Sequence, residues 1–152
     1  VITAILNFST KQRRIQFNPS VGFRKLKRDT KEMQFWNQAE AVSFLSKMNE
    51  LYPVGSKQRW VYVSYLTALN TSLRAGEIWG LQVQDISPEG TSLWIRRQFN
   101  RVTQDFGPTK GKKARHVPCS EDLLSEFQNL IKTQRLKNED TLFRNEKGLP
   151  IC

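Results

Sequence analysis

The sequence predicts an α+β fold that is mainly helical and carries one small antiparallel sheet of three strands. Apolar residues recur at helical spacing in two segments, 37–51 and 120–131, and an almost wholly apolar segment, 60–69, lies between them. In residues 92–118, apolar and polar residues instead alternate, as they do in strands. Turns that contain glycine separate the alternating stretches. The length of 152 residues suits about one domain with a real core.

Residues 1–34 differ from the rest of the chain. Residues 1–8 (VITAILNF) are compatible with the end of a helix or with a short strand. Asn-Pro, glycine and many bases then follow without a helical period, which is typical of an extended linker. We expect residues 35–152 to hold the main core.

Each predicted helix has its own signals. Asn37 can cap the first helix while Glu40 reaches back to it, and Pro53 ends the helix. Residues 60–69 are apolar on all sides, which favours a central helix, although their β-branched and aromatic content leaves a buried strand as an alternative. Residues 75–81 predict a short helix. Ser120 caps the last one, whose apolar face is Leu123, Leu124, Phe127, Leu130 and Ile131.

The sheet is predicted after a turn at residues 85–90. Residues 92–99 (SLWIRRQF) alternate, with Leu93, Ile95 and Arg97 on one face. Residues 102–118 can supply one or two more strands, joined at Gly107-Pro108 and Gly111. The sheet would carry bases at its turns.

The formal net charge of +10 is concentrated in two segments. Such clusters suit a polyanion, because bound bases release counterions from it; nucleic acid is the leading partner, and an anionic membrane surface is second. The first segment contains eight bases: Lys11, Arg13, Arg14, Arg24, Lys25, Lys27, Arg28 and Lys31. The second contains seven: Arg96, Arg97, Arg101, Lys110, Lys112, Lys113 and Arg115.

Cys119, Cys152 and the single His116 provide too few ligands for a zinc site or a disulfide framework, so we expect no metal and no cofactor. The chain has no apolar run of about 18 residues and no secretory signal at its start. We therefore expect a cytoplasmic protein that does not enter a membrane.

Three motifs stand in order: TSLRAGE at 71–77, LQVQDI at 81–86 and TKGKKARHVP at 109–118. With the helices around them they resemble the tyrosine recombinase, or phage integrase, family over Phe35 to Pro150. The resemblance implies part of a DNA breaking-rejoining catalytic domain, with residues 1–34 as the end of a core-binding domain and its linker. It also implies double-stranded DNA as partner, a parent protein that is tetrameric on DNA, and a prokaryotic, phage or mobile-element source.

Members of that family cut one strand with a tyrosine and form a 3′-phosphotyrosine link. By the same resemblance Arg74 is a catalytic arginine and Lys110 is the general acid, with Lys112 as the alternative. An arginine fork suits this role because it can hold two phosphate oxygens as charge develops in the transition state. The expected nucleic-acid contacts are Arg96, Arg97, Lys112, Lys113 and Arg115.

The chain departs from the family pattern in two places. Ser72 stands where the family usually has glycine. The family's H-x-x-R motif and nucleophilic tyrosine fall after the aligned segment, whereas all three tyrosines here precede Arg74: Tyr52, Tyr62 and Tyr65. We therefore expect the 152-residue chain to be inactive alone, while its parent is an enzyme. The alternative is a non-enzymatic basic DNA- or RNA-binding module, with Trp94, Phe99 and Phe106 as stacking surfaces.

Overall fold

The computed structural model describes residues 2–23, 32–145, 148 and 150. The chain divides into two compact units, Val1–Phe35 and Trp36–Cys152. Cys152 and five of the predicted linker bases lie outside the described residues: Arg24, Lys25, Lys27, Arg28 and Lys31. In the first unit, Ile2–Lys11 form helix α1. The helix alternative for this segment is therefore correct, and the strand alternative is wrong.

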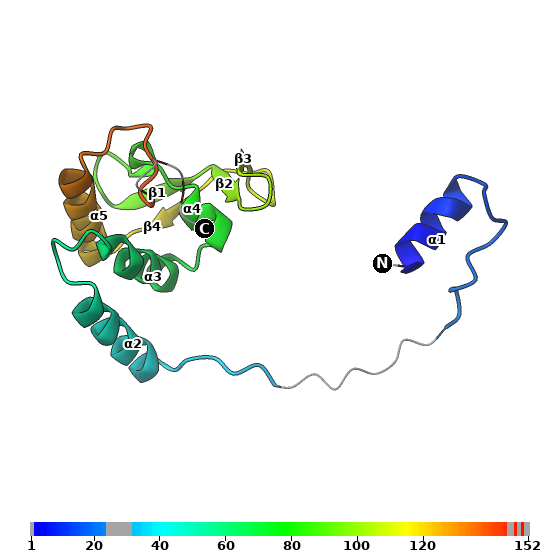
Figure 1. Cartoon of the computed structure of the whole chain (residues 1–152), viewed down its shortest axis with the longest axis horizontal. Helices are drawn as coiled ribbons and strands as arrows, with labels where there is room; N and C mark the ends of the chain where they lie inside the picture. The colour runs from blue at the N-terminus through cyan, green and yellow to red at the C-terminus, as the bar shows by residue number, and fades with distance from the viewer. Residues whose placement is uncertain (1, 24–31, 146–147, 149, 151–152) are drawn as a thin grey trace. The chain divides into compact units, whose positions relative to one another are not determined.

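Four α-helices of the second unit follow the predicted order (Figure 1): α2 (Gln38–Leu51), α3 (Arg59–Thr71), α4 (Ala75–Trp79) and α5 (Glu121–Gln134). The expected caps are present. Asn37 Oδ1 accepts from the amide of Glu40 at 2.9 Å, and the Glu40 carboxylate accepts from the amide of Asn37 at 2.8 Å. Ser120 Oγ accepts from the amide of Leu123 at 3.3 Å. Polar residues before each apolar run thus determine where these helices begin.

The sheet is small and antiparallel, as predicted, but its strand count differs from the expected three. Strand β1 (Ser92–Ile95) pairs with β4 (Arg115–Pro118), and β2 (Arg97–Asn100) pairs with β3 (Asp105–Pro108). The ribbon is interrupted between the two pairs, at Arg96 on one side and residues 109–114 on the other. Ile86 contacts β1 by a single bridge to Leu93. The prediction of one three-stranded sheet was therefore wrong, because a loop with its own hydrogen bonds interrupts the ladder.

Helix α4 rests on β2 through two glycines. Gly76 belongs to α4 and Gly80 caps its C-terminal end; they lie four residues apart and both face β2. A Cβ at Gly76 would lie 3.0 Å from the carbonyl oxygen of Phe99, and one at Gly80 would lie 3.1 Å from the Cα of Gln98. The opposing atoms are backbone, which cannot move aside as a flexible side chain can. The glycines therefore fix the distance between α4 and the strand.

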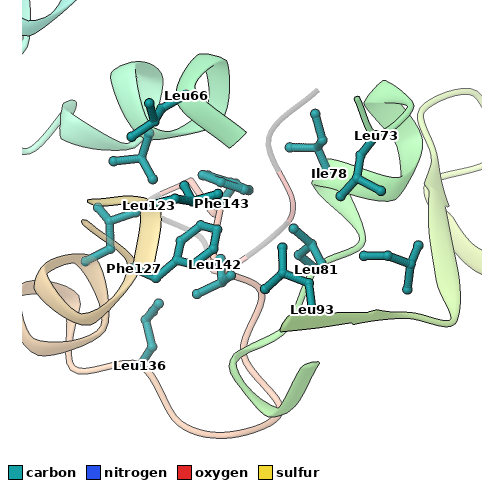
Figure 2. Close-up of a cluster of buried hydrophobic side chains, with 13 residues drawn as sticks. Leu66, Leu73, Ile78, Leu81, Leu93, Leu123, Phe127, Leu136, Leu142 and Phe143 are labelled. Atoms are coloured by element: carbon teal, nitrogen blue, oxygen red, sulfur yellow. The ribbon is translucent and has the colours of Figure 1, made fainter. Parts of the chain in front are cut away.

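One hydrophobic core joins α3, α4, β1, α5 and the segment after α5 (Figure 2). Phe127 and Phe143 are fully buried, and Leu81 and Leu93 extend the cluster toward α4 and the sheet. Leu73 and Ile78 are buried on either side of the start of α4. The backbone around Arg74 is therefore anchored by core packing.

An arginine that the sequence interpretation did not single out connects three helices. Arg59 is buried at the start of α3, and its guanidinium donates to Glu126 on α5 and to Asn49 on α2. It also lies over the ring of Tyr62, 4.0 Å from the centroid. None of the helices in the described ranges is long and apolar enough to cross a membrane.

Candidate functional site

Arg74 stands where the chain leaves α3 and enters α4. Ser72, just before it, ends α3 in the left-handed region at φ 52° and ψ 28°. A serine therefore adopts the conformation that glycine adopts most easily. The turn places Arg74 directly before α4, with its side chain 62% exposed. A permanently charged fork is thus presented to solvent from a turn that the buried side chains of Leu73 and Ile78 anchor.

Glu77 lies beneath Arg74 and has a fully buried side chain. Its Oε2 accepts from the backbone amide of Arg74 at 3.0 Å, and its Oε1 lies 3.5 Å from Nη1 of Arg74. Glu77 therefore holds the backbone at the position where α4 begins.

Arg115, at the start of β4, holds the same carboxylate. Its Nη1 donates to Oε1 of Glu77 and its Nη2 donates to Oε2, each at 2.9 Å. These two hydrogen bonds are the main cause that keeps the pKa of Glu77 below its ordinary value, against the opposite effect of burial. They also raise the pKa of Arg115. Glu77 is therefore ionised at neutral pH and ties β4 to the start of α4.

Asp85 forms a second buried carboxylate centre. Its Oδ1 accepts from Nε of Arg96 at 2.8 Å, and its Oδ2 accepts from Nη1 of Arg97 and from the backbone amide of Gln82. Arg96 also lies over the ring of Trp94, 4.5 Å from the centroid. Arg96 and Arg97, which were predicted to contact nucleic acid, thus have a carboxylate partner within the chain.

The loop between β3 and β4 carries the three candidate lysines, and the side chains of Lys110, Lys112 and Lys113 are exposed. Thr109 anchors the loop: it is buried, its hydroxyl donates to the carbonyl of Lys113 at 3.0 Å, and its carbonyl accepts from the amide of Lys112 at 2.8 Å. Lys112 sits at a positive φ of 52°. Among the described residues, none of the three lysines forms an ion pair with a carboxylate.

The structure brings some of the predicted site residues together and leaves others apart. Arg74 and Arg115 meet at Glu77, whereas Arg96 and Arg97 meet at Asp85. The sequence interpretation missed both links through buried acids. A partial signal was present for Glu77, which stands between Gly76 and Ile78 in a mostly apolar segment, because a buried carboxylate needs a cationic partner; the sequence near it does not show which cation.

The remaining polar candidates form no second site in the described part of the chain. His116 is exposed on β4 and stacks on Trp94, with centroids 6.0 Å apart. Tyr65 packs edge-on against Phe44 on the outer side of α3. Burial raises the pKa of the Cys119 thiol. No group of three or more His, Cys, Asp or Glu side chains suited to a metal occurs among the described residues.

Comparison with known proteins agrees with this geometry. The phage integrase family matches residues 34–152. No curated protein matches the chain. Two solved structures of the Tn1549 transposon integrase, one with circular intermediate DNA and one with transposon right end DNA, share the fold, with TM-scores of 0.75 and 0.73 at 23% identity. Each match covers 98% of this chain and 50% of the integrase.

XerA recombinase is a more distant structural relative, with a TM-score of 0.55 and 14% identity over 99% of this chain and 47% of its own. The chain thus spans about half the length of the solved structures that it matches. The match over residues 34–152 covers most of the sequence, and its described part contains the recombinase-like turn, the buried acids and the lysine loop. The chain belongs to the phage integrase family of tyrosine recombinases.

Proposed function

We propose that this chain is the N-terminal part of the catalytic domain of a DNA integrase or site-specific recombinase. Residues 1–34 are the end of a core-binding domain and its basic linker. The parent protein is cytoplasmic, assembles as a tetramer on double-stranded DNA, and breaks and rejoins strands through a 3′-phosphotyrosine intermediate. The DNA complexes of the Tn1549 integrase support a DNA partner.

The observation that carries the proposal is the presentation of Arg74. Its guanidinium is mostly exposed, yet its backbone is held by Glu77 and by the buried neighbours Leu73 and Ile78. A fork on a backbone fixed in this way can donate to two non-bridging oxygens of a phosphodiester. It stabilises the extra charge of the five-coordinate transition state, and only the side chain has to be ordered when the phosphate binds.

Lys110 is proposed as the general acid that protonates the 5′-oxygen leaving group. It directly follows the buried Thr109, whose two hydrogen bonds close the loop. An exposed lysine on a closed loop can be placed against an alkoxide while its ammonium supplies the proton. Lys112 is the alternative donor, and Lys112 and Lys113 otherwise contact DNA phosphates. Arg96 and Arg97 are proposed to contribute to the DNA-binding surface through their cationic field, whereas both Nη groups of Arg115 donate to Glu77.

The test separates binding from chemistry in the parent protein. Arg74→Ala should abolish covalent strand cleavage, because a transition-state contact is lost. Its affinity for duplex DNA should change by less than about threefold, because one phosphate contact among many contributes little to binding. Lys132→Gln on α5 is the control for loss of one exposed positive charge. A proportional loss of affinity and cleavage in Arg74→Ala would refute the catalytic role.

A further inference from the structure

Arg115 makes hydrogen bonds inside the protein that an arginine serving only to bind a DNA phosphate would not need. Both ends of its fork are directed at the Glu77 carboxylate, with two hydrogen bonds of 2.9 Å. A guanidinium engaged in this bidentate manner has its strongest acceptor inside the protein. The positive charge of Arg115 is therefore largely neutralised by Glu77.

Arg74 also contacts Glu77, but its guanidinium lies farther from the carboxylate than the guanidinium of Arg115 does. The nearest side-chain approach, from Nη1 of Arg74 to Oε1 of Glu77, is 3.5 Å, whereas the backbone amide of Arg74 donates at 3.0 Å. Glu77 thus holds the backbone of Arg74 firmly and its guanidinium loosely. The loose contact leaves donors of the Arg74 fork available.

The Arg74 guanidinium can stay loosely held only while Arg115 neutralises Glu77. The Glu77 side chain is fully buried, and a buried carboxylate without a cation is costly. If Arg115 were absent, Arg74 would be the cation left in contact with Glu77, and its fork would turn onto the carboxylate. The arginine that should bind substrate would then neutralise an internal acid.

We propose that Arg115 is a positioning residue: by satisfying Glu77 from strand β4, it keeps the Arg74 guanidinium free for the scissile phosphate. The role rests on the proposed function, since it needs Arg74 to bind that phosphate. It also connects the two sides of the site, because β4 follows the loop that carries Lys110. If a shift of this loop moved β4, Arg115 would move with it, and the position of Arg74 would change through their shared contact with Glu77.

The experiment uses the full-length recombinase that contains this chain, in single-turnover cleavage of a nicked suicide duplex. Two scissile linkages are compared, a phosphodiester and an uncharged methylphosphonate. Arg115→Gln should cleave the phosphodiester about 10- to 100-fold more slowly, as expected when a catalytic group is misplaced. Its duplex affinity should stay within about twofold of the wild type. On the methylphosphonate, which lacks the charge that Arg74 binds, its defect should shrink to within about threefold, as it should for Arg74→Ala.

Two further variants keep the test decisive if Arg115→Gln folds poorly. Arg115→Lys retains a charge but lacks the fork, and should show a smaller defect of the same kind. The double variant Glu77→Gln with Arg115→Gln should cleave the phosphodiester faster than Arg115→Gln alone, because no buried carboxylate then recruits Arg74. Lys132→Gln is again the charge control and should behave as the wild type.

Other outcomes would overturn the role of Arg115. Equal loss of rate on both linkages would mean that Arg115 supports only the fold. A weaker duplex affinity with a smaller salt dependence would mean that it binds a DNA phosphate directly. A wild-type protein that cleaves neither linkage would instead refute the proposed function itself.

Discussion

Ser72 shows what a single residue does to the turn before Arg74. Its φ of 52° lies in the left-handed region, where a side chain is disfavoured. Ser72→Gly should therefore raise the free energy of unfolding by up to about 1 kcal/mol, since glycine reaches this conformation without steric cost. Urea denaturation of the 152-residue chain measures it. Ser72→Ala, which keeps the Cβ, is the matched control; an equal gain in both variants would contradict the conformational explanation.

Glu77 makes stability depend on pH, and the sign follows from its lowered pKa. A carboxyl group whose pKa is lower in the folded state stabilises the fold above its unfolded pKa, ordinarily about 4.5. That contribution is lost as the pH falls through the folded value. Because Arg115 is partly exposed, we expect Glu77→Gln to cost only about 1 to 2 kcal/mol at pH 7.

The measurement is the difference in free energy of unfolding between wild type and Glu77→Gln, at pH 7 and at pH 3. The other carboxylates are common to both proteins and cancel in the difference. The difference should shrink toward pH 3. A difference that is the same at both pH values would show that the charge of Glu77 is not what stabilises the fold.

At the scale of elements, the contact between α4 and β2 is set by two glycines rather than by side chains. Gly80→Ala would place a methyl group 3.1 Å from backbone atoms of Gln98 and Phe99. Overpacking against backbone costs about 1 to 3 kcal/mol, which thermal unfolding would detect as a lower midpoint. Gly111→Ala is the control, because nothing lies within 4 Å of its added Cβ. A neutral Gly80→Ala would mean that α4 can shift on the strand.

The junction of α2, α3 and α5 depends on Arg59. Breaking a buried ion pair leaves an uncompensated charge, so Arg59→Met should cost about 3 to 5 kcal/mol because Glu126 stays behind. Adding Glu126→Gln should restore part of that loss. A double-mutant cycle by urea denaturation gives the coupling, and additive effects would contradict a direct pair.

Local signals in the sequence were sufficient for the helices but not for the sheet. The caps at Asn37 and Ser120 and the apolar period place α2 and α5, because these are properties of neighbouring residues. The sheet is interrupted at residues 109–114 by hydrogen bonds within a folded loop. The alternation of apolar and polar residues in the sequence does not predict those bonds. The partners of Glu77 and Asp85 are 38 and 11 to 12 residues away, so no local pattern reveals them.

For the whole molecule, the basic segments should make the proposed binding of DNA depend on salt concentration. If Lys113 binds one phosphate, Lys113→Gln in the 152-residue chain should reduce the slope of log K against log salt by about 0.9. Duplex titrations between roughly 50 and 200 mM salt measure it. Lys137→Gln, which removes an exposed charge beyond α5, should leave the slope unchanged. Equal changes in both variants would indicate a diffuse effect of net charge.

The central claim is the proposal that the chain supplies phosphate-binding groups to a recombinase and that none of its three tyrosines is the nucleophile. Its own tyrosines precede Arg74, and Tyr62 and Tyr65 belong to α3. The most direct measurement is trapping of a covalent adduct on a suicide duplex by the parent protein and by the 152-residue chain. We expect a 3′-phosphotyrosyl adduct with the parent protein and none with the chain alone. An adduct on Tyr52, Tyr62 or Tyr65, or no adduct with the parent protein, would contradict the account.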